Sequence, residues 1–211
     1  YIPGFPNLIG APTRAAEPAP QKAPAAAAPT AAVPVTVAGA ALPWSVNVAN
    51  YDAAQPAFDH VRKLTSRFQP ARFFIVPEPT QGVLYWKVMG GMADDSTALA
   101  PLRDQLIAAG ELDEEAIGGR SSIFQPRPLA YELGEFRTEA EAVARADSLT
   151  GRAIPAYVAA VPYSDGTERW KVYGGAYRDS ASAAPMQKIL AGASIQPRLV
   201  ERSGRPPASP K

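Results

Sequence analysis

The feature that most constrains this chain is a short motif that occurs twice in matching surroundings. Trp-Lys-Val-x-Gly-Gly begins at Trp86 and again at Trp170, 84 residues later, and both copies are followed by Asp-Ser and then Ala-Pro. Gln-Pro-Arg occurs at Gln125 and Gln196, an offset of 71, so the first copy holds 13 additional residues near GELDEEAIGGRSS. The pattern predicts a tandem duplication of a module of roughly 75 residues, close to the lower size limit for a chain that buries its own core.

Each copy has the pattern of a βαββαβ unit. In the first, WSVNVANY alternates as a half-buried strand does, and residues 52–68 have helical spacing. RFFIV is a short strand before the turn PEPTQG, and VLYWKVMG and residues 94–110 add a strand and a helix. The second copy repeats this order as strand 129–136, helix 138–150, strand 156–161, strand 168–175, helix 179–192 and strand 194–201. We therefore expect an α+β fold of two tandem ferredoxin-like βαββαβ sandwiches, each with helices on one face of a sheet and the other face open for function.

The ends of the chain have a different composition. Residues 1–43 are rich in Ala and Pro, which favours an extended arm or linker. We expect modules at 44–127 and 129–202 and a disordered tail at 203–211. The tip of the arm is more apolar and supplies candidate anchors for a partner: Tyr1, Ile2, Phe5, Leu8 and Ile9. Because the chain begins with Tyr and not Met, we interpret an upstream segment as missing, and a signal peptide or a membrane anchor would both fit.

Charge and composition exclude several classes of function. The chain carries 21 Lys and Arg against 20 Asp and Glu, a net charge of +1 that argues against nucleic acid as a partner. It has no Cys, so disulfides and thiolate metal sites are excluded. No apolar run approaches the roughly 20 residues of a membrane helix.

Candidates for catalysis are few. His60 is the only His, so a His cluster for metal cannot form, and we expect a surface or part-buried structural His. The acidic run at Glu111 and residues 113–115 lacks the ligand spacing of a Ca²⁺ loop and is interpreted as a solvated charge run. Trp86 and Trp170 have the parity of core residues. We expect no enzyme activity, no cofactor and no metal site.

The pairing of VNVANY with WKVMGG, and of YELGEF with WKVYGGAY, resembles the SPOR (sporulation-related repeat) domain. The first strand of that family reads roughly Val-Gln-Val-Gly-Ser-Phe and the third Tyr-Arg-Val-Arg-Val-Gly-Pro-Phe. The likeness covers about 44–127 and 129–202, and the second copy matches the third strand at Trp170, Lys171, Val172, Gly175 and Tyr177. The resemblance implies a periplasmic envelope protein, held behind an anchor and a low-complexity linker, that binds peptidoglycan glycan strands lacking stem peptides.

The candidate glycan or partner face departs from the family pattern. Where the family has a Gln on the open face of its first strand, this chain has Asn47 and Glu132, and Glu132 is expected to pair with Lys171 across the strands. The open-face candidates are Asn47, Lys87, Met89, Glu132, Lys171 and Tyr173. The alternative is that Lys87 and Lys171 are ordinary solvated strand positions.

Two functions remain open at this point. The altered open face favours a structural subunit of an inner-membrane or other envelope complex, whose protein partner binds residues 1–43. Pro-rich segments suit such docking because they bind in an extended form with little entropy to lose. The alternative is a periplasmic peptidoglycan-binding protein. The identity of the complex, for example a divisome, respiratory or photosynthetic one, stays open.

Overall fold

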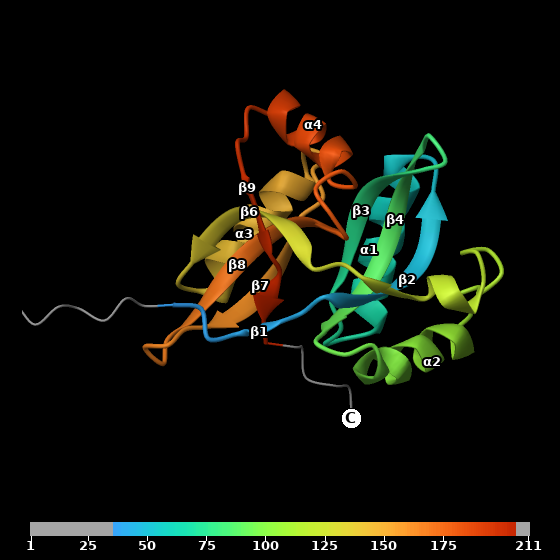
Figure 1. The fold of residues 1–211 in the computed structure, drawn as a ribbon, viewed down its shortest axis with the longest axis horizontal. Coiled ribbons are helices and arrows are strands. Elements are labelled where there is room, and N and C mark those ends of the chain that lie inside the picture. The colour runs from blue at the N-terminus through green and yellow to red at the C-terminus, as the bar shows by residue number, and fades with distance from the viewer. Residues whose placement is uncertain (1–35, 206–211) are drawn as a thin grey trace, which may run out of the picture. The chain divides into compact units, whose positions relative to one another are not determined.

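The computed structural model describes residues 36–205, which form two four-stranded antiparallel sheets and a two-stranded ribbon (Figure 1). The N-terminal sheet has the order β3-β4-β2-β5. Its elements are β2 (Trp44–Tyr51), α1 (Ala54–Arg67), β3 (Phe73–Thr80), β4 (Val83–Ala93), the 3-10 helix η1 (Thr97–Leu99), α2 (Ala100–Ala108), the 3-10 helix η2 (Arg120–Ser122) and β5 (Phe124–Pro126).

The C-terminal sheet has the order β7-β8-β6-β9. Its elements are β6 (Leu129–Phe136), α3 (Glu139–Thr150), β7 (Tyr157–Pro162), β8 (Glu168–Tyr177), α4 (Ala184–Gly192) and β9 (Arg198–Glu201). In both sheets the first and third strands of the unit are central and the second and fourth are edges. The expected α+β class with antiparallel sheets is confirmed.

The two sheets also share their strand register. Tyr51 lies opposite Trp86 in the N-terminal sheet, and Phe136 lies opposite Trp170 in the C-terminal sheet. The first strand of each sheet has two register irregularities, at corresponding points. The second of them follows Asn47 in β2 and Glu132 in β6. The Trp86 ring packs toward Phe58 of α1, with 6.4 Å between ring centroids.

Strand β3 is longer than RFFIV, because it continues through Pro77 and Pro79 to Thr80 and leaves only Gln81 and Gly82 in the turn. The prediction that PEPTQG is a turn was wrong for its first four residues. Proline lacks an amide donor, which an edge strand tolerates on its unpaired side, and β3 pairs only with β4.

The ribbon joins the two ends of the described chain. Ala40–Ala41 form β1 and Ser203–Gly204 form β10, and the two strands pair antiparallel. The expected disordered tail is therefore wrong at its start, and the end of the expected arm belongs to the fold. Backbone pairing of small residues makes this possible without a side-chain pattern. Residues 1–35, with the predicted anchors Tyr1, Ile2, Phe5, Leu8 and Ile9, and residues 206–211 lie outside the described residues.

The N-terminal sheet is buried on both faces. Phe73 and Ile75 face one core with α1, whereas Phe74 and Val76 face a second core shared with the C-terminal sheet. Met89 of β4 belongs to the second core too. The prediction of an open face was therefore wrong for this sheet, and the continuous apolar run FFIV is typical of a strand buried on both sides. Between residues 36 and 205, no helix is long and apolar enough to cross a membrane.

Candidate binding face

The candidate face of the C-terminal sheet is the side that residues Lys171 and Tyr173 share. Tyr157 lies opposite Tyr173 and Ala159 lies opposite Lys171, and residues directly opposite in an antiparallel pair point to the same side. Glu132 on β6 pairs with Tyr173 from the other flank. The structure thus brings together the three site residues that were predicted for the second copy.

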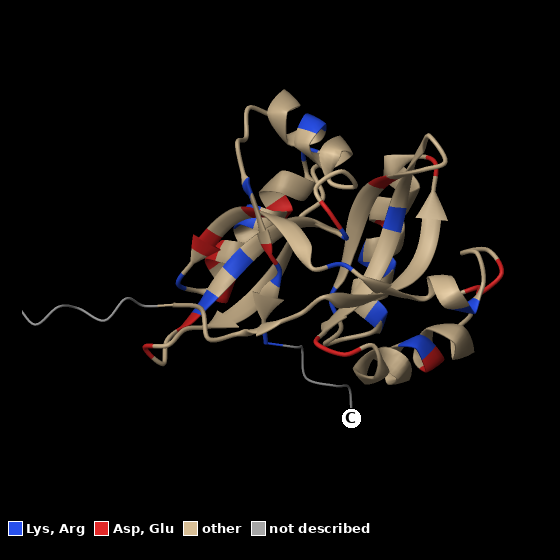
Figure 2. Cartoon of the chain, in the orientation of Figure 1, with Lys and Arg blue, Asp and Glu red and all other residues tan. Residues whose placement is uncertain are grey.

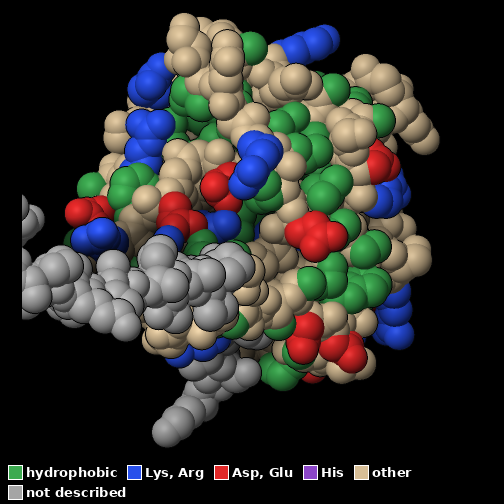
Figure 3. All heavy atoms as spheres, turned by 60° about the vertical axis from the view of Figure 1, so that its left-hand side comes forward, with side chains coloured by type: hydrophobic (Ala, Val, Ile, Leu, Met, Phe, Trp, Pro, Cys, Tyr) green, Lys and Arg blue, Asp and Glu red, His purple; other side chains and the backbone are tan. Residues whose placement is uncertain are grey.

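Lys171 is neutralised on this face by two carboxylates. Its Nζ lies 2.7 Å from an Oε of Glu132 and 3.8 Å from an Oε of Glu135. Arg169 donates to Glu135 at 2.7 Å, and the Tyr163 hydroxyl donates to Glu135 as well. The Glu132–Lys171 pair anticipated from the sequence is therefore present, within a five-residue network that also includes Glu135, Arg169 and Tyr163. Figure 3 shows acidic and basic side chains side by side on this part of the molecule.

The network shifts the pKa values of Lys171 and Glu135 in the directions that keep them charged, and that of Tyr163 in the direction that keeps its hydroxyl protonated. Burial alone would lower the pKa of Lys171, but the bond to Glu132, together with the nearby Glu132 charge and the hydroxyls of Tyr173 and Tyr163, raises it overall. Burial would likewise raise the pKa of Glu135, but the bonds from Tyr163 and Arg169 lower it overall. Burial and the Glu135 carboxylate raise the pKa of Tyr163 to about 12. A ligand on this face has to compete with satisfied ion pairs.

The chain itself covers the rest of this face. Residues 36–38 and 203–205 bond along the edge of β7 or its following turn: Ala38 N donates to Pro162 O at 2.9 Å, Ser164 N to Thr36 O at 2.8 Å, and Arg205 N to Ala160 O at 2.8 Å. The ribbon reaches further over the sheet, where the Tyr173 hydroxyl donates to Ser203 O at 3.2 Å. Tyr173 is completely buried, within the second core that the two sheets share. Strand β1 pairs with β10, and β10 lies against β7.

A buried arginine fixes the ribbon to the rest of the fold. Arg202 is 1% exposed, and its Nε donates to Leu42 O at 2.9 Å. One of its terminal nitrogens donates to Ser45 Oγ at 3.0 Å, and its guanidinium lies over the Phe74 ring, 5.4 Å from the centroid. These contacts join the ribbon, the N-terminal sheet and the second core.

Of the predicted site residues of the first copy, two are buried and Lys87 is partly buried. Met89 is fully buried in the second core, and Asn47 is 1% exposed, with no hydrogen-bond partner for its Oδ1 among residues 36–205. Lys87 lies 2.7 Å from the Glu78 carboxylate. Asn47 and Met89 do not belong to a solvent-facing glycan surface in this structure, because the C-terminal half packs against the same side of the sheet, and Lys87 is only partly accessible.

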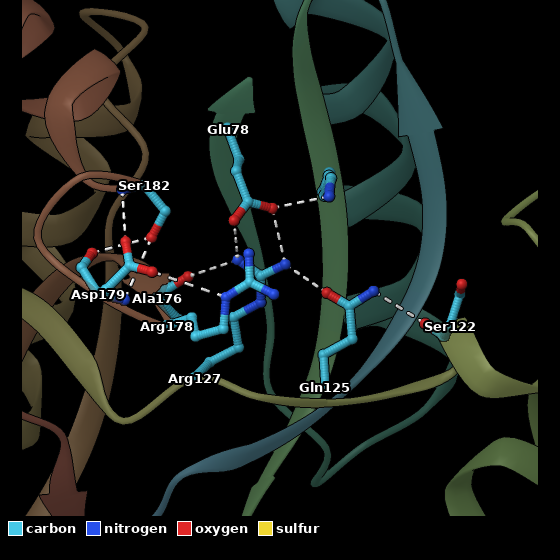
Figure 4. Close-up of polar contacts among 9 residues, drawn as sticks. Glu78, Ser122, Gln125, Arg127, Ala176, Arg178, Asp179 and Ser182 are labelled. Carbon is cyan, nitrogen blue, oxygen red and sulfur yellow. Dashed lines mark hydrogen bonds and ion pairs between the residues drawn. The ribbon is translucent and has the colours of Figure 1, made fainter. Parts of the chain in front are cut away.

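The junction between the sheets has a polar centre that the sequence did not reveal (Figure 4). Arg127 donates to both carboxylate oxygens of Glu78 at 2.8 Å each, and to Ala176 O at 3.4 Å. Burial would raise the pKa of Glu78, but Arg127 and Lys87 lower it overall. Glu78 was assigned to a turn and Arg127 to the boundary between modules, so neither had a local signal of burial.

A pocket lies beside His60. It has a volume of about 650 Å³ and includes the loop that holds the additional residues of the first copy. The Tyr51 hydroxyl lies 3.0 Å from His60 Nδ1, and Glu111 lies 3.3 Å from His60 Nε2. The Glu111 side chain is only 7% exposed and also binds Lys63 and Arg67, so the prediction of a solvated charge run was wrong for this residue.

These groups do not make a metal centre. Among residues 36–205, no three His, Asp or Glu side chains are placed to hold a metal ion. Burial lowers the pKa of His60 and favours its neutral form, despite the opposing bond to Glu111. His60 joins β2, α1 and the loop at Glu111, which is a structural role.

A comparison with known protein families gives a match for the C-terminal half of the chain and none for the N-terminal half. Residues 126–200 match the family model of the SPOR domain. The SPOR domain is a non-catalytic, peptidoglycan-binding module of the bacterial envelope. The match spans the C-terminal sheet and confirms the resemblance there, whereas no second match covers the N-terminal sheet. No curated protein and no solved structure matches the chain.

Proposed function

We propose that this chain is a non-catalytic structural subunit of the bacterial cell envelope, in which the SPOR domain is a building block and not a free glycan receptor. The covered face carries this proposal. Tyr173 is buried in the core that the two sheets share and its hydroxyl bonds to Ser203 O, and Lys171 is held by Glu132 and Glu135. The side of the SPOR sheet that faces away from its helices is thus engaged within the chain.

The N-terminal half fits the same role as a diverged second copy of the unit. Its strand order and the Trp86 register match those of the SPOR half. Its apolar residues on the side shared with the SPOR half, Phe74, Val76 and Met89, are of the kind that form permanent contacts. The two copies then act as one rigid block.

Attachment to the envelope is assigned to the arm. Residues 1–35 are rich in Ala and Pro and have an apolar tip with Tyr1, Ile2 and Phe5. Such a segment has too little apolar area to fold alone. Its apolar residues are therefore assigned to contacts with a partner protein. The proposed partner is a protein complex at the periplasmic side of the inner membrane.

A truncation tests this attachment. A version that begins at Thr36 keeps β1 and the ribbon. Its circular dichroism spectrum in the region of helices and strands and its unfolding midpoint should therefore equal those of the full chain. We expect it to lose binding to detergent-solubilised native membranes, and the full chain with Ile2→Ser, Phe5→Ser and Leu8→Ser to lose it too. Equal retention of all three versions would show that the folded part, and not the arm, makes the attachment.

A second candidate function is favoured by the family match itself. The SPOR half retains a partly accessible rim at Glu132, Arg169 and Arg198. Binding of glycan strands that lack stem peptides would use this rim together with Lys171 and would require the ribbon to move from Tyr173. Binding to amidase-treated sacculi distinguishes this function from the structural one.

A further inference from the structure

A small pocket lies at the junction of the two sheets. Its volume is about 280 Å³, and its lining includes Glu78, Lys87, Ser122, Gln125, Arg127 and Arg178. Figure 4 shows Arg178, which follows β8, beside Arg127 at this junction. The pocket combines residues from the N-terminal sheet, the connection between the sheets and the SPOR half.

Positive charge is in excess in this pocket. Three of its lining residues are cations, Lys87, Arg127 and Arg178, and one is an anion, Glu78, so the lining of the described pocket has a net charge of +2 (3 − 1). Asp179 lies 3.7 Å from Arg178, but both side chains are more than half exposed, and water screens such a pair.

The corresponding region of the SPOR half is balanced. There Lys171 contacts two carboxylates, Glu132 and Glu135. At the matching register positions around Lys87 the N-terminal sheet has Asn47 and Asn50. Lys87 therefore shares the single carboxylate of Glu78 with Arg127.

Burial makes the excess charge significant. The side chains of Arg127 and Lys87 are 5% and 12% exposed, and buried cations are unfavourable unless anions or acceptors surround them. The terminal nitrogens of Arg127 are used by Glu78, Gln125 and Ala176, but its Nε has no partner among residues 36–205. One more anion at the pocket would offset this charge.

We propose that the pocket binds a small oxyanion, a carboxylate or a phosphate group. Lys87 and Arg178 would contact it directly, because Lys87 has donors beyond its bond to Glu78 and Arg178 is largely exposed. Arg127 would lie behind them as a further positive charge. The site does not depend on the function proposed for the arm or for the covered SPOR face.

Titration of the ¹⁵N-labelled full chain tests the site. Inorganic phosphate, D-lactate and neutral N-acetylglucosamine are added at constant ionic strength, and the side-chain Nε–H signals of the arginines are followed by NMR. We expect saturable shifts at Arg178 and Arg127 with phosphate or D-lactate and none with N-acetylglucosamine. Tighter binding of phosphate assigns the ligand to phosphate groups, and tighter binding of D-lactate assigns it to carboxylates.

Two variants and a control complete the test. Arg178→Gln should weaken anion binding about two- to fivefold, the range expected for one largely exposed charge. Arg62→Gln is a matched control, since Arg62 is similarly exposed, 71% against 69%, and pairs with its own neighbour Asp59. Glu78→Gln should tighten binding by removing the only carboxylate of the lining. Absence of saturable shifts with both anions, or equal affinity of Arg178→Gln and the unaltered chain, would overturn the proposal.

Discussion

The packing of the ribbon on the SPOR sheet can be tested at Gly204. A Cβ added to Gly204 would lie 2.8 Å from the carbonyl oxygen of Ala160, 3.3 Å from Leu42 Cδ1 and 3.6 Å from Ala159 Cβ. The nearest of these atoms is backbone and cannot rotate away. Gly204→Ala should therefore lift β10 from the edge of β7.

The size of the effect follows from the contacts at risk. The Arg205 N to Ala160 O bond of 2.8 Å and the Tyr173 hydroxyl bond to Ser203 O of 3.2 Å both depend on this approach. Each bond contributes about 0.5–1.5 kcal/mol net to the free energy of unfolding. Replacing Gly by Ala lowers the entropy of the unfolded chain, which offsets about 0.4–1 kcal/mol of that loss. We expect a net loss of about 1–2 kcal/mol in the free energy of unfolding, or a Tm lower by about 2–8 °C.

Urea unfolding followed by Trp fluorescence gives this free energy, and hydrogen exchange of the Arg205 amide reports the local contact. Gly192→Ala is the control, because an added Cβ there meets nothing within 4 Å, and its stability should stay equal or rise slightly. An unchanged midpoint for Gly204→Ala, with Arg205 still protected, would refute the close packing of the ribbon.

Two further predictions concern the cores. Phe74→Ala should cost about 3–5 kcal/mol of stability in urea unfolding, because it removes a fully buried ring stacked on Tyr157 at 4.2 Å; a cost below about 1 kcal/mol would show that the sheets are not packed through this residue. Glu111→Gln should cost about 1–3 kcal/mol at pH 7. The bond from Lys63 holds the pKa of Glu111 below its usual value despite burial, so the stabilisation is present above about pH 4.5 and lost as pH falls through the lowered folded pKa. Unfolding midpoints of the two proteins should converge on acidification, and a constant difference from pH 7 to pH 3 would contradict the assignment.

Local patterns were sufficient to predict the α+β class and the SPOR resemblance over 126–200. Alternation in WSVNVANY and helical spacing in 139–150 are set by which face each element buries, and that information lies within a few residues. The Glu132–Lys171 contact was predictable for the same reason, since the two strands are neighbours in the unit.

The covering of both faces was not predictable in this way. The contacts responsible join distant segments, as in the bond from Arg202 to Leu42 O, and they use backbone atoms that have no sequence signature. The run FFIV was the one available signal, because all four residues are apolar in a strand expected to have a single buried face. Composition assigned Ser203 and Gly204 to a tail, although the missing side chain of Gly204 is what lets the ribbon approach Ala160.

Whether the covered face of the C-terminal sheet binds glycan is tested most directly by cosedimentation of the purified full chain with amidase-treated sacculi. A SPOR domain of established glycan binding is the positive control. Because Tyr173 is buried in the core that the two sheets share and Lys171 is paired with Glu132, we predict that the chain stays in the supernatant at concentrations that retain the control. Saturable retention of the unaltered chain that is lost in Lys171→Ala would contradict the account and establish the SPOR face as a glycan receptor.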